Sequence, residues 1–325
     1  AHVGKERSGK YKILYRQRDY HGTTLGALSA TGQPQRKQDY GPLCPGFSEF
    51  PHALCYRCPF GEEYPACDVR CARAVETAIL KEGPDTVGGV IVEPITAGGG
   101  IIPPVPEYYT LVHEICRKND VFLIMDEVVC GFGRTGRWWG YEHYDIIPDM
   151  VTLAKGMASS YEPLSATVVR EPIFDQFVND LNDPDQRMNF FRDISTYGGC
   201  TAPMRAALET VQILEEENLI ENSRVMGGYL LDGLMELHDL PIVGDVRGKG
   251  LFCGVEYVQD KASKTPITEE LMAALMNGVK EEGVLVGRTY SSLPGNNTTM
   301  NFAPALTISR DQVDTIVSAV RRAIE

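Results

Sequence analysis

Two apolar runs that each end in acidic residues constrain the fold of this chain most. The runs cover residues 87–93 and 121–127, and both stay apolar up to their terminal carboxylates. Continuous apolar runs of this length are typical of parallel strands that are buried on both faces. Between them, residues 106–120 place apolar side chains at helical spacing. The order strand, helix, strand predicts an α/β fold with a mostly parallel sheet and helices on both of its faces.

Further elements extend this first region. Short strands are expected at 150–154 and 166–169, followed by a helix at 202–214. In that helix, Met204, Leu208 and Val211 share one predicted apolar stripe, and a run of glutamates ends it. We therefore expect a large domain over residues 1–217.

The pattern changes in the last third of the chain. A helix up to residue 238, strands within 245–257, a helix at 271–281 and a strand near Met300 predict a smaller α+β domain over residues 218–325. Ser309 and Gln312 have the spacing of a capping box, so a final helix is expected to begin there.

The charge balance limits the classes of partner. Lys plus Arg total 31 against 44 Asp plus Glu, a net charge of −13. Such a chain repels nucleic acid and anionic membranes, so we expect small-molecule substrates and neither of those partners. The longest apolar runs have the length of strands, and no segment resembles a signal peptide. A cytoplasmic protein is expected.

The cysteines offer an ambiguous signal. Of nine, four form the pattern Cys55-x-x-Cys58 and Cys67-x-x-x-Cys71, which has the count and spacing of a structural zinc site. Free surface thiols or a loop peculiar to one family are the favoured explanations, since a large fold does not need a metal to hold it together. We assign no metal, and whether these cysteines bind one stays open.

Three polar residues follow predicted strands and can converge. Ligands bind outside the carboxyl ends of an open parallel sheet, where Glu93, Asp126 and Lys155 are expected. A lysine buried among apolar neighbours has a lowered pKa and condenses readily with an aldehyde. An aspartate beside a pyridine nitrogen keeps that nitrogen protonated. The alternative is that Asp126 caps a loop and Lys155 is a solvated residue at a strand end.

Two long motifs favour the catalytic interpretation. Residues 126–136 read Asp-Glu-Val-Val-Cys-Gly-Phe-Gly-Arg-Thr-Gly, and residues 148–156 read Pro-Asp-Met-Val-Thr-Leu-Ala-Lys-Gly. Together they resemble the signature of class III aminotransferases of fold type I, which use pyridoxal 5′-phosphate. The resemblance implies that Asp126 pairs with the pyridine nitrogen, Val128 packs on the ring, and Lys155 holds the cofactor as a Schiff base.

Other segments resemble the family in the same order. Tyr20-His21-Gly22 is similar to its ring-stacking aromatic motif, and Glu93 is similar to a glutamate near its cofactor. Thr196 resembles the threonine that binds cofactor phosphate in the neighbouring subunit, which implies a homodimer. Taken alone, Tyr20 is more typical of core packing and Thr196 of a turn.

The motif Gly131-x-Gly133-x-x-Gly136 also fits the dinucleotide pattern. Such a loop must open a helix whose N-terminus meets the pyrophosphate, and residues 137–148 show no amphipathic helix. We therefore reject nicotinamide binding.

Some positions depart from the family. Its members begin upstream with a segment that cradles the phosphate, so weaker cofactor retention is expected here. Asn301 stands where users of 2-oxoglutarate often carry an arginine, and Val129 stands where a glutamine often contacts the cofactor. Arg288 falls where pyruvate-dependent members carry a mobile arginine for the keto acid's carboxylate, although an exposed loop arginine is the alternative. The taurine and pyruvate branch is the most similar.

The sequence thus predicts an aminotransferase that moves an amino group from a primary amine or ω-amino acid to a keto acid, expected to be pyruvate. Two alternatives remain. One is a truncated pseudoenzyme with weak or no turnover, and the other is a decarboxylase or mutase on the same fold.

Overall fold

The larger sheet is built from strands within residues 12–169. In this computed structural model, residues 9–184, 186–289 and 292–325 are described. Six strands pair in the order β2-β1-β3-β4-β5-β6. They are β1 (Lys12–Arg16), β2 (Phe47–Phe50), β3 (Val87–Val92), β4 (Phe122–Asp126), β5 (Met150–Leu153) and β6 (Ala166–Val169). All neighbours are parallel except β6, which runs antiparallel to β5. The predicted mostly parallel α/β sheet is confirmed.

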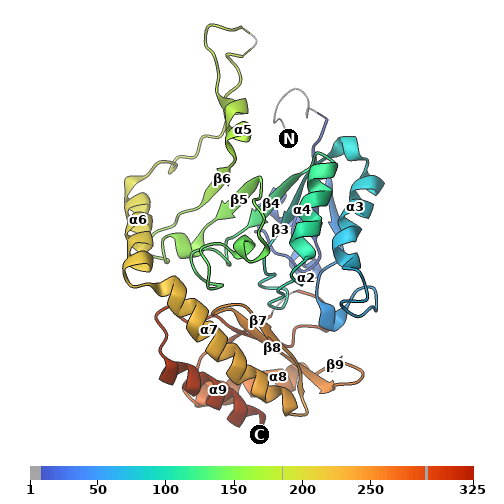
Figure 1. The fold of residues 1–325 in the computed structure, drawn as a ribbon, viewed down its shortest axis with the longest axis vertical. Coiled ribbons are helices and arrows are strands. Elements are labelled where there is room, and N and C mark those ends of the chain that lie inside the picture. Colours follow the sequence, from blue (N-terminus) through green and yellow to red (C-terminus); the bar gives the residue numbers. More distant parts are fainter. Residues whose placement is uncertain (1–8, 185, 290–291) are drawn as a thin grey trace.

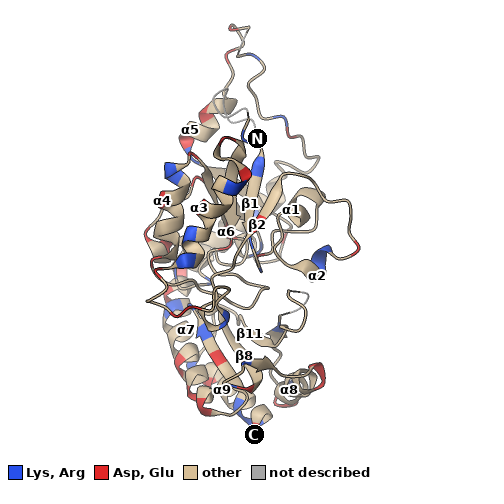
Figure 2. Cartoon of the chain, turned by 90° about the vertical axis from the view of Figure 1, so that its right-hand side faces the viewer, with Lys and Arg blue, Asp and Glu red and all other residues tan. Residues whose placement is uncertain are grey.

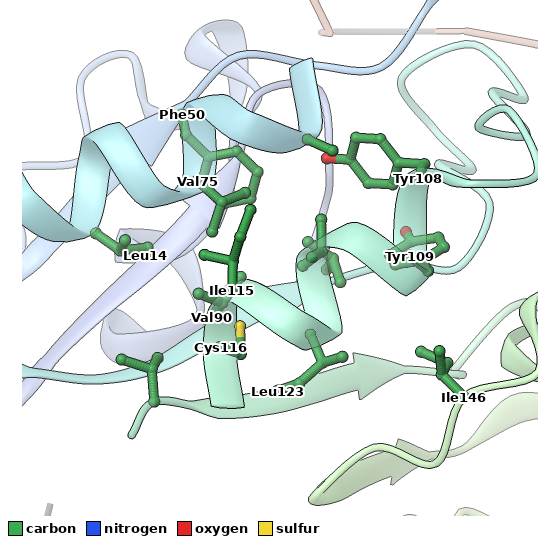
Figure 3. Close-up of a cluster of buried hydrophobic side chains, with 14 of the residues drawn as sticks. Leu14, Phe50, Val75, Val90, Tyr108, Tyr109, Ile115, Cys116, Leu123 and Ile146 are labelled. Carbon is green, nitrogen blue, oxygen red and sulfur yellow. The ribbon is translucent and has the colours of Figure 1, made fainter. Parts of the chain in front are cut away.

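Two helices bury one face of this sheet (Figure 1). They are α3 (Arg70–Glu82) and α4 (Tyr108–Lys118). Figure 3 shows Val75 of α3 and Ile115 of α4 above Val90 and Leu123 of the strands, and all four are buried. Burying each such side chain contributes roughly 1.5–3 kcal/mol. This packing fixes the strands whose carboxyl ends carry the polar residues.

The helix α6 (Thr201–Glu216) corrects one expectation. Its predicted apolar stripe is wrong in part, because Met204 is 45% and Leu208 64% exposed. The buried positions are Ala207 and Leu214, with Leu214 packed near Leu153 of β5. The helix therefore turns a different stripe toward the sheet and leaves apolar side chains facing outward.

Short helices connect these elements. The α-helical ones are α1 (Leu25–Ser29), α2 (Pro34–Lys37) and α5 (Glu171–Phe174). The 3-10 helices are η2 (Cys55–Arg57), η3 (Pro84–Thr86), η4 (Gly140–Tyr144), η5 (Lys155–Met157), η6 (Asp175–Phe177) and η7 (Glu236–Asp239). Among the described residues, no helix has both the length and the apolar character needed to cross a bilayer.

A second, antiparallel sheet lies in the C-terminal third (Figure 1). Its strands are β7 (Val243–Gly248), β8 (Cys253–Asp260), β9 (Thr265–Pro266), β10 (Gly287–Arg288) and β11 (Thr299–Phe302). Three helices pack against it, α7 (Leu219–Met235), α8 (Glu269–Glu281) and α9 (Arg310–Ile324). We call this region the small lobe.

The capping box predicted for α9 is confirmed. Ser309 Oγ accepts a bond of 3.4 Å from the Gln312 amide, and Gln312 Oε1 accepts one of 2.9 Å from the Ser309 amide. These bonds satisfy amides that have no partner within the helix. The helix then packs Val313 and Val320 into the small-lobe core.

The glycine-rich loop 131–136 joins the sheet to the small lobe. Arg134 Nη1 donates to the carbonyl oxygens of Leu251 at 3.0 Å and Pro304 at 2.6 Å. A Cβ on Gly136, whose φ is +82°, would lie 2.8 Å from Arg224 Cα of α7. The glycines therefore allow close contact between this loop and α7. The first helix after the loop is the short 3-10 helix η4.

Candidate active site

Asp126 ends β4 and lies at the centre of a buried polar group. Its Oδ2 is 2.7 Å from His21 Nδ1, and its Oδ1 accepts a bond of 3.1 Å from the Val128 amide. The side chains of His21 and Asp126 are 2% and 6% exposed. Asp126 pairs with Thr152 in the parallel register of β4 and β5, so Lys155 emerges at the same edge of the sheet.

Lys155 adopts an unusual backbone conformation. Its φ is +43°, and its carbonyl oxygen accepts bonds from the amides of Ala158 at 3.3 Å and Ser159 at 3.0 Å. A left-handed conformation is uncommon for a residue other than glycine and often marks functional sites. The side chain lines an open pocket with Ser160 and Glu162.

The expectation that Lys155 is buried among apolar neighbours is wrong for the single chain. The residue is exposed in the structure. It is the first residue of η5, which follows the end of β5. Any exclusion of water from its amine must therefore come from a bound molecule or from a second chain.

The Tyr20-His21-Gly22 segment is held over the end of β3. The Tyr20 amide donates to Glu93 Oε1 at 2.8 Å, and the His21 amide donates to Thr31 Oγ1 at 3.1 Å. Gly22 has a φ of +132°, which side chains rarely tolerate, and a Cβ there would lie 3.0 Å from Ala27 Cβ. This turn brings His21 to Asp126.

Glu93 binds backbone amides with both carboxylate oxygens. Besides Tyr20, it accepts a bond of 3.0 Å from the Ala97 amide. Burial raises its pKa well above the ordinary value, and the nearby Asp19 and Asp126 carboxylates raise it further. Glu93 therefore holds the segment that carries His21, and a direct contact between Glu93 and a cofactor stays a prediction.

Sequence reasoning missed the role of Glu127. Its side chain is fully buried and accepts bonds of 2.9 Å from the amides of Gly140 and Tyr141. Burial raises its pKa to about 7. The only signal was an acid placed at the end of a buried strand. Through these two hydrogen bonds, Glu127 connects the loop after β4 with the first residues of η4.

The pairing of His21 with Asp126 was also not predicted. The two residues are 105 positions apart, and no local pattern links them. His21 Nε2 is buried and has no hydrogen-bond partner among the described residues. That nitrogen is consistent with a polar contact to a bound molecule.

Two predicted residues lie apart from this group. Thr196 is exposed in the segment between α5 and α6, which extends away from the sheet (Figure 1). Arg288 lies on β10 and forms an ion pair of 2.8 Å with Glu269 in the first turn of α8. Their roles in binding phosphate and keto acid stay predictions.

The four clustered cysteines line one cavity. Cys55, Cys58, Cys67 and Cys71 surround it together with Tyr64, and none forms a disulfide. Burial raises the pKa of Cys71 to about 11. Within residues 9–184, 186–289 and 292–325, no three His, Cys, Asp or Glu side chains are arranged to hold a metal ion.

Comparison with known proteins decides the family. The family model Aminotransferase class-III matches residues 1–324. The chain belongs to the class III aminotransferases. A class III aminotransferase from Bilophila wadsworthia, named taurine–pyruvate aminotransferase, is 51% identical over 99% of this chain and 70% of its own length. The hypotaurine/taurine–pyruvate aminotransferase of Paracoccus denitrificans is 49% identical over 99% of this chain and 69% of its own length.

Solved structures agree with this assignment. A Bacillus anthracis aminotransferase superposes with a TM-score of 0.93 at 41% identity, covering 98% of this chain and 70% of its own length. A structure titled "Transaminase with L-ala" has a TM-score of 0.90 at 34% identity, covering 98% and 73%. The expected fold type I architecture and aminotransferase activity of this class III enzyme are confirmed. Membership of the class also implies dependence on pyridoxal phosphate.

Proposed function

We propose that this enzyme moves an amino group from a primary amine or an ω-amino acid to pyruvate, with pyridoxal 5′-phosphate as its cofactor. One structural observation carries the proposal. The buried Asp126 and His21 pair and the Lys155 amine lie at the same edge of the parallel sheet. The names of the two taurine–pyruvate relatives support the choice of donor and acceptor.

The residues at this edge fit the cofactor. A pyridine ring needs a carboxylate that keeps its nitrogen protonated, and Asp126 is a buried carboxylate that His21 orients. Val128 is half-buried beside Asp126 and offers an apolar contact. When bound, pyridoxal phosphate supplies an aldehyde and a ring that accepts electrons from the substrate carbon.

Each side chain has a distinct task in this scheme. Lys155 Nζ would hold the cofactor and would move a proton to and from the reacting substrate carbon. Asp126 would keep the ring nitrogen protonated, and the 2.7 Å contact with His21 keeps its carboxylate in place. Glu93 fixes the His21 segment through the Tyr20 amide.

The first experiment tests the lysine. Protein mixed with pyridoxal phosphate is reduced with borohydride, its absorbance spectrum is compared before and after, and the modified peptide is mapped. The expected label is a pyridoxyl group on Lys155. A label on any other residue contradicts the site assignment.

The second experiment tests the reaction. The protein is incubated with cofactor, pyruvate and either taurine or phenylethylamine, and alanine is measured. Alanine formation is expected. No alanine at any cofactor concentration would favour a pseudoenzyme, and release of carbon dioxide or a rearranged product would indicate a decarboxylase or mutase.

We further propose a homodimer in which Thr196 contributes to the partner's phosphate site. Large apolar side chains are exposed along the segment that carries it, including Leu181, Phe191, Ile194 and Tyr197. Exposed apolar surface of this kind marks an interaction site. The helix α6 also exposes Met204 and Leu208. A monomeric mass in analytical ultracentrifugation at micromolar protein would contradict this arrangement.

Two further expectations remain proposals. A domain boundary at residues 217 and 218 is supported by separate hydrophobic cores on its two sides. A cytoplasmic location is supported by nine cysteines that are all free.

A further inference from the structure

A cation lies over the aromatic residue of the candidate site. The guanidinium carbon of Arg36, on α2, is 4.7 Å from the centroid of the Tyr20 ring. Stacking of arginine on an aromatic face is attractive and leaves the edges of the guanidinium available to other partners. Tyr20 precedes His21, which contacts Asp126. Arg36 is therefore connected to the buried carboxylate through two consecutive residues.

The position of Arg36 is fixed by a buried amide. Arg36 Nε donates to Gln33 Oε1 at 2.7 Å, and Gln33 Nε2 donates to the carbonyl oxygen of Arg18 at 2.8 Å. Gln33 is fully buried. Because one edge of the guanidinium is anchored in this way, its terminal nitrogens are oriented before any ligand arrives.

The same short helix contacts the small lobe. Asn297 Nδ2 donates to Gln35 Oε1 at 3.0 Å. In Figure 2, α2 with its basic residues lies above β11. The segment that carries Arg36 is therefore held between the Tyr20 turn and the loop that precedes β11.

The charge of Arg36 is not neutralised by the protein. In the described part of the chain, no carboxylate forms an ion pair with Arg36, and its side chain is only half-buried. The neighbouring Lys37 differs, because its ammonium group donates to Tyr15 Oη at 2.9 Å and to the Ser29 carbonyl oxygen at 3.0 Å. Arg288 is already paired with Glu269. A cation with free donors beside the site suits an anionic ligand.

We propose that Arg36 receives the acidic group of the amino donor, a sulfonate or a carboxylate carried at the end opposite to the reacting amine. The inference rests on the proposed function and names a residue that selects among its donors. The terminal nitrogens of the guanidinium can bind two oxygens of such a group at once. An amine without an acidic group cannot make this contact.

The test compares two classes of donor in the donor half-reaction alone. Holoenzyme is mixed with taurine, or with phenylethylamine, which carries no acidic group, in the absence of pyruvate. The change in cofactor absorbance gives the rate and the half-saturating donor concentration. The variants are Arg36→Met, Arg36→Lys and, as the matched control, Lys37→Met. Cofactor affinity and melting temperature are recorded for every variant.

For Arg36→Met we expect the half-saturating concentration of taurine to rise about 10-fold to 100-fold, the usual range for a lost charged hydrogen bond. The half-saturating concentration of phenylethylamine and the affinity for cofactor should change little. Arg36→Lys should recover part of the loss, and Lys37→Met should resemble the wild type with both donors.

Two results would overturn the inference. One is an equal response of both donors to Arg36→Met. The other is a weakened affinity for cofactor that accounts for the whole effect, which would make Arg36 a positioning residue for Tyr20. Failure of the proposed function is separate from both, because the wild type would then react with neither donor.

Discussion

His21 Nδ1 lies 2.7 Å from Asp126 Oδ2, although the two residues are 105 positions apart in the sequence. The contact joins the turn after β1 to the carboxyl end of β4. Both side chains are almost fully buried, so their charges and dipoles act through a medium that screens them poorly. The pair therefore presents Asp126 in one orientation.

Removing His21 should weaken the hold on the cofactor. In His21→Ala, the Val128 amide is the one hydrogen-bond donor that remains to the Asp126 carboxylate among the described residues. We expect the dissociation constant for pyridoxal phosphate to rise about tenfold, since a hydrogen bond to a charged group contributes roughly 1.5–3 kcal/mol. Absorbance titration measures it. The exposed His238→Ala is the control, and equal affinities in the two variants would contradict the assigned role.

Replacing Lys155 should abolish turnover. Lys155→Ala removes the amine that we propose to bind the cofactor and move the proton, so the rate of alanine formation should fall about 1,000-fold or more. Lys118→Ala, which removes a surface ion pair with Glu76, should leave the rate unchanged. An undiminished rate in Lys155→Ala is incompatible with the proposed mechanism.

Glu127 should make stability fall as the pH rises. Burial raises its pKa from an ordinary 4.5 to about 7 in the folded protein. Between those values the folded state binds a proton that the unfolded state has lost, so the stabilising contribution is complete below pH 4.5 and is lost as the pH passes 7. At about 1.4 kcal/mol for each pKa unit, the loss approaches about 3 kcal/mol.

Glu127→Gln resembles the protonated acid and should remove this dependence. Urea unfolding measures the free energy of unfolding of both proteins. At about pH 5 the two values should be similar, and at about pH 8 the variant should be more stable than the wild type. The exposed Glu217→Gln serves as the control. A variant that is less stable than the wild type only at the higher pH would refute the assignment.

Leu123 should matter for stability far more than an exposed leucine. It is fully buried in the core shown in Figure 3, so Leu123→Ala should lower the free energy of unfolding by about 2–5 kcal/mol. Leu80 is 60% exposed, and Leu80→Ala should change the free energy of unfolding by less than about 0.5 kcal/mol. Urea unfolding followed by circular dichroism measures both. Equal losses would show that the core is not packed as described.

Local pattern was enough to predict the main helices and strands. The apolar runs before Glu93 and Asp126 are β3 and β4, and the helix between them is α4. Alternation of strand and helix implies a parallel sheet whose carboxyl ends share one edge, because the connections run over its faces. The capping box of Ser309 is likewise a property of neighbouring residues.

The contacts between residues far apart in the sequence were decided by the tertiary structure. The sequence contains Arg36 and Tyr20, His21 and Asp126, and Glu127 and Gly140, but their contacts depend on how loops from different strands are packed together. Which side chains are buried also depends on the tertiary structure. Met204 and Leu208 of α6 and Lys155 were expected to be buried and are exposed in the single chain. Periodicity shows which side chains share a face of a helix, but it does not show what covers that face.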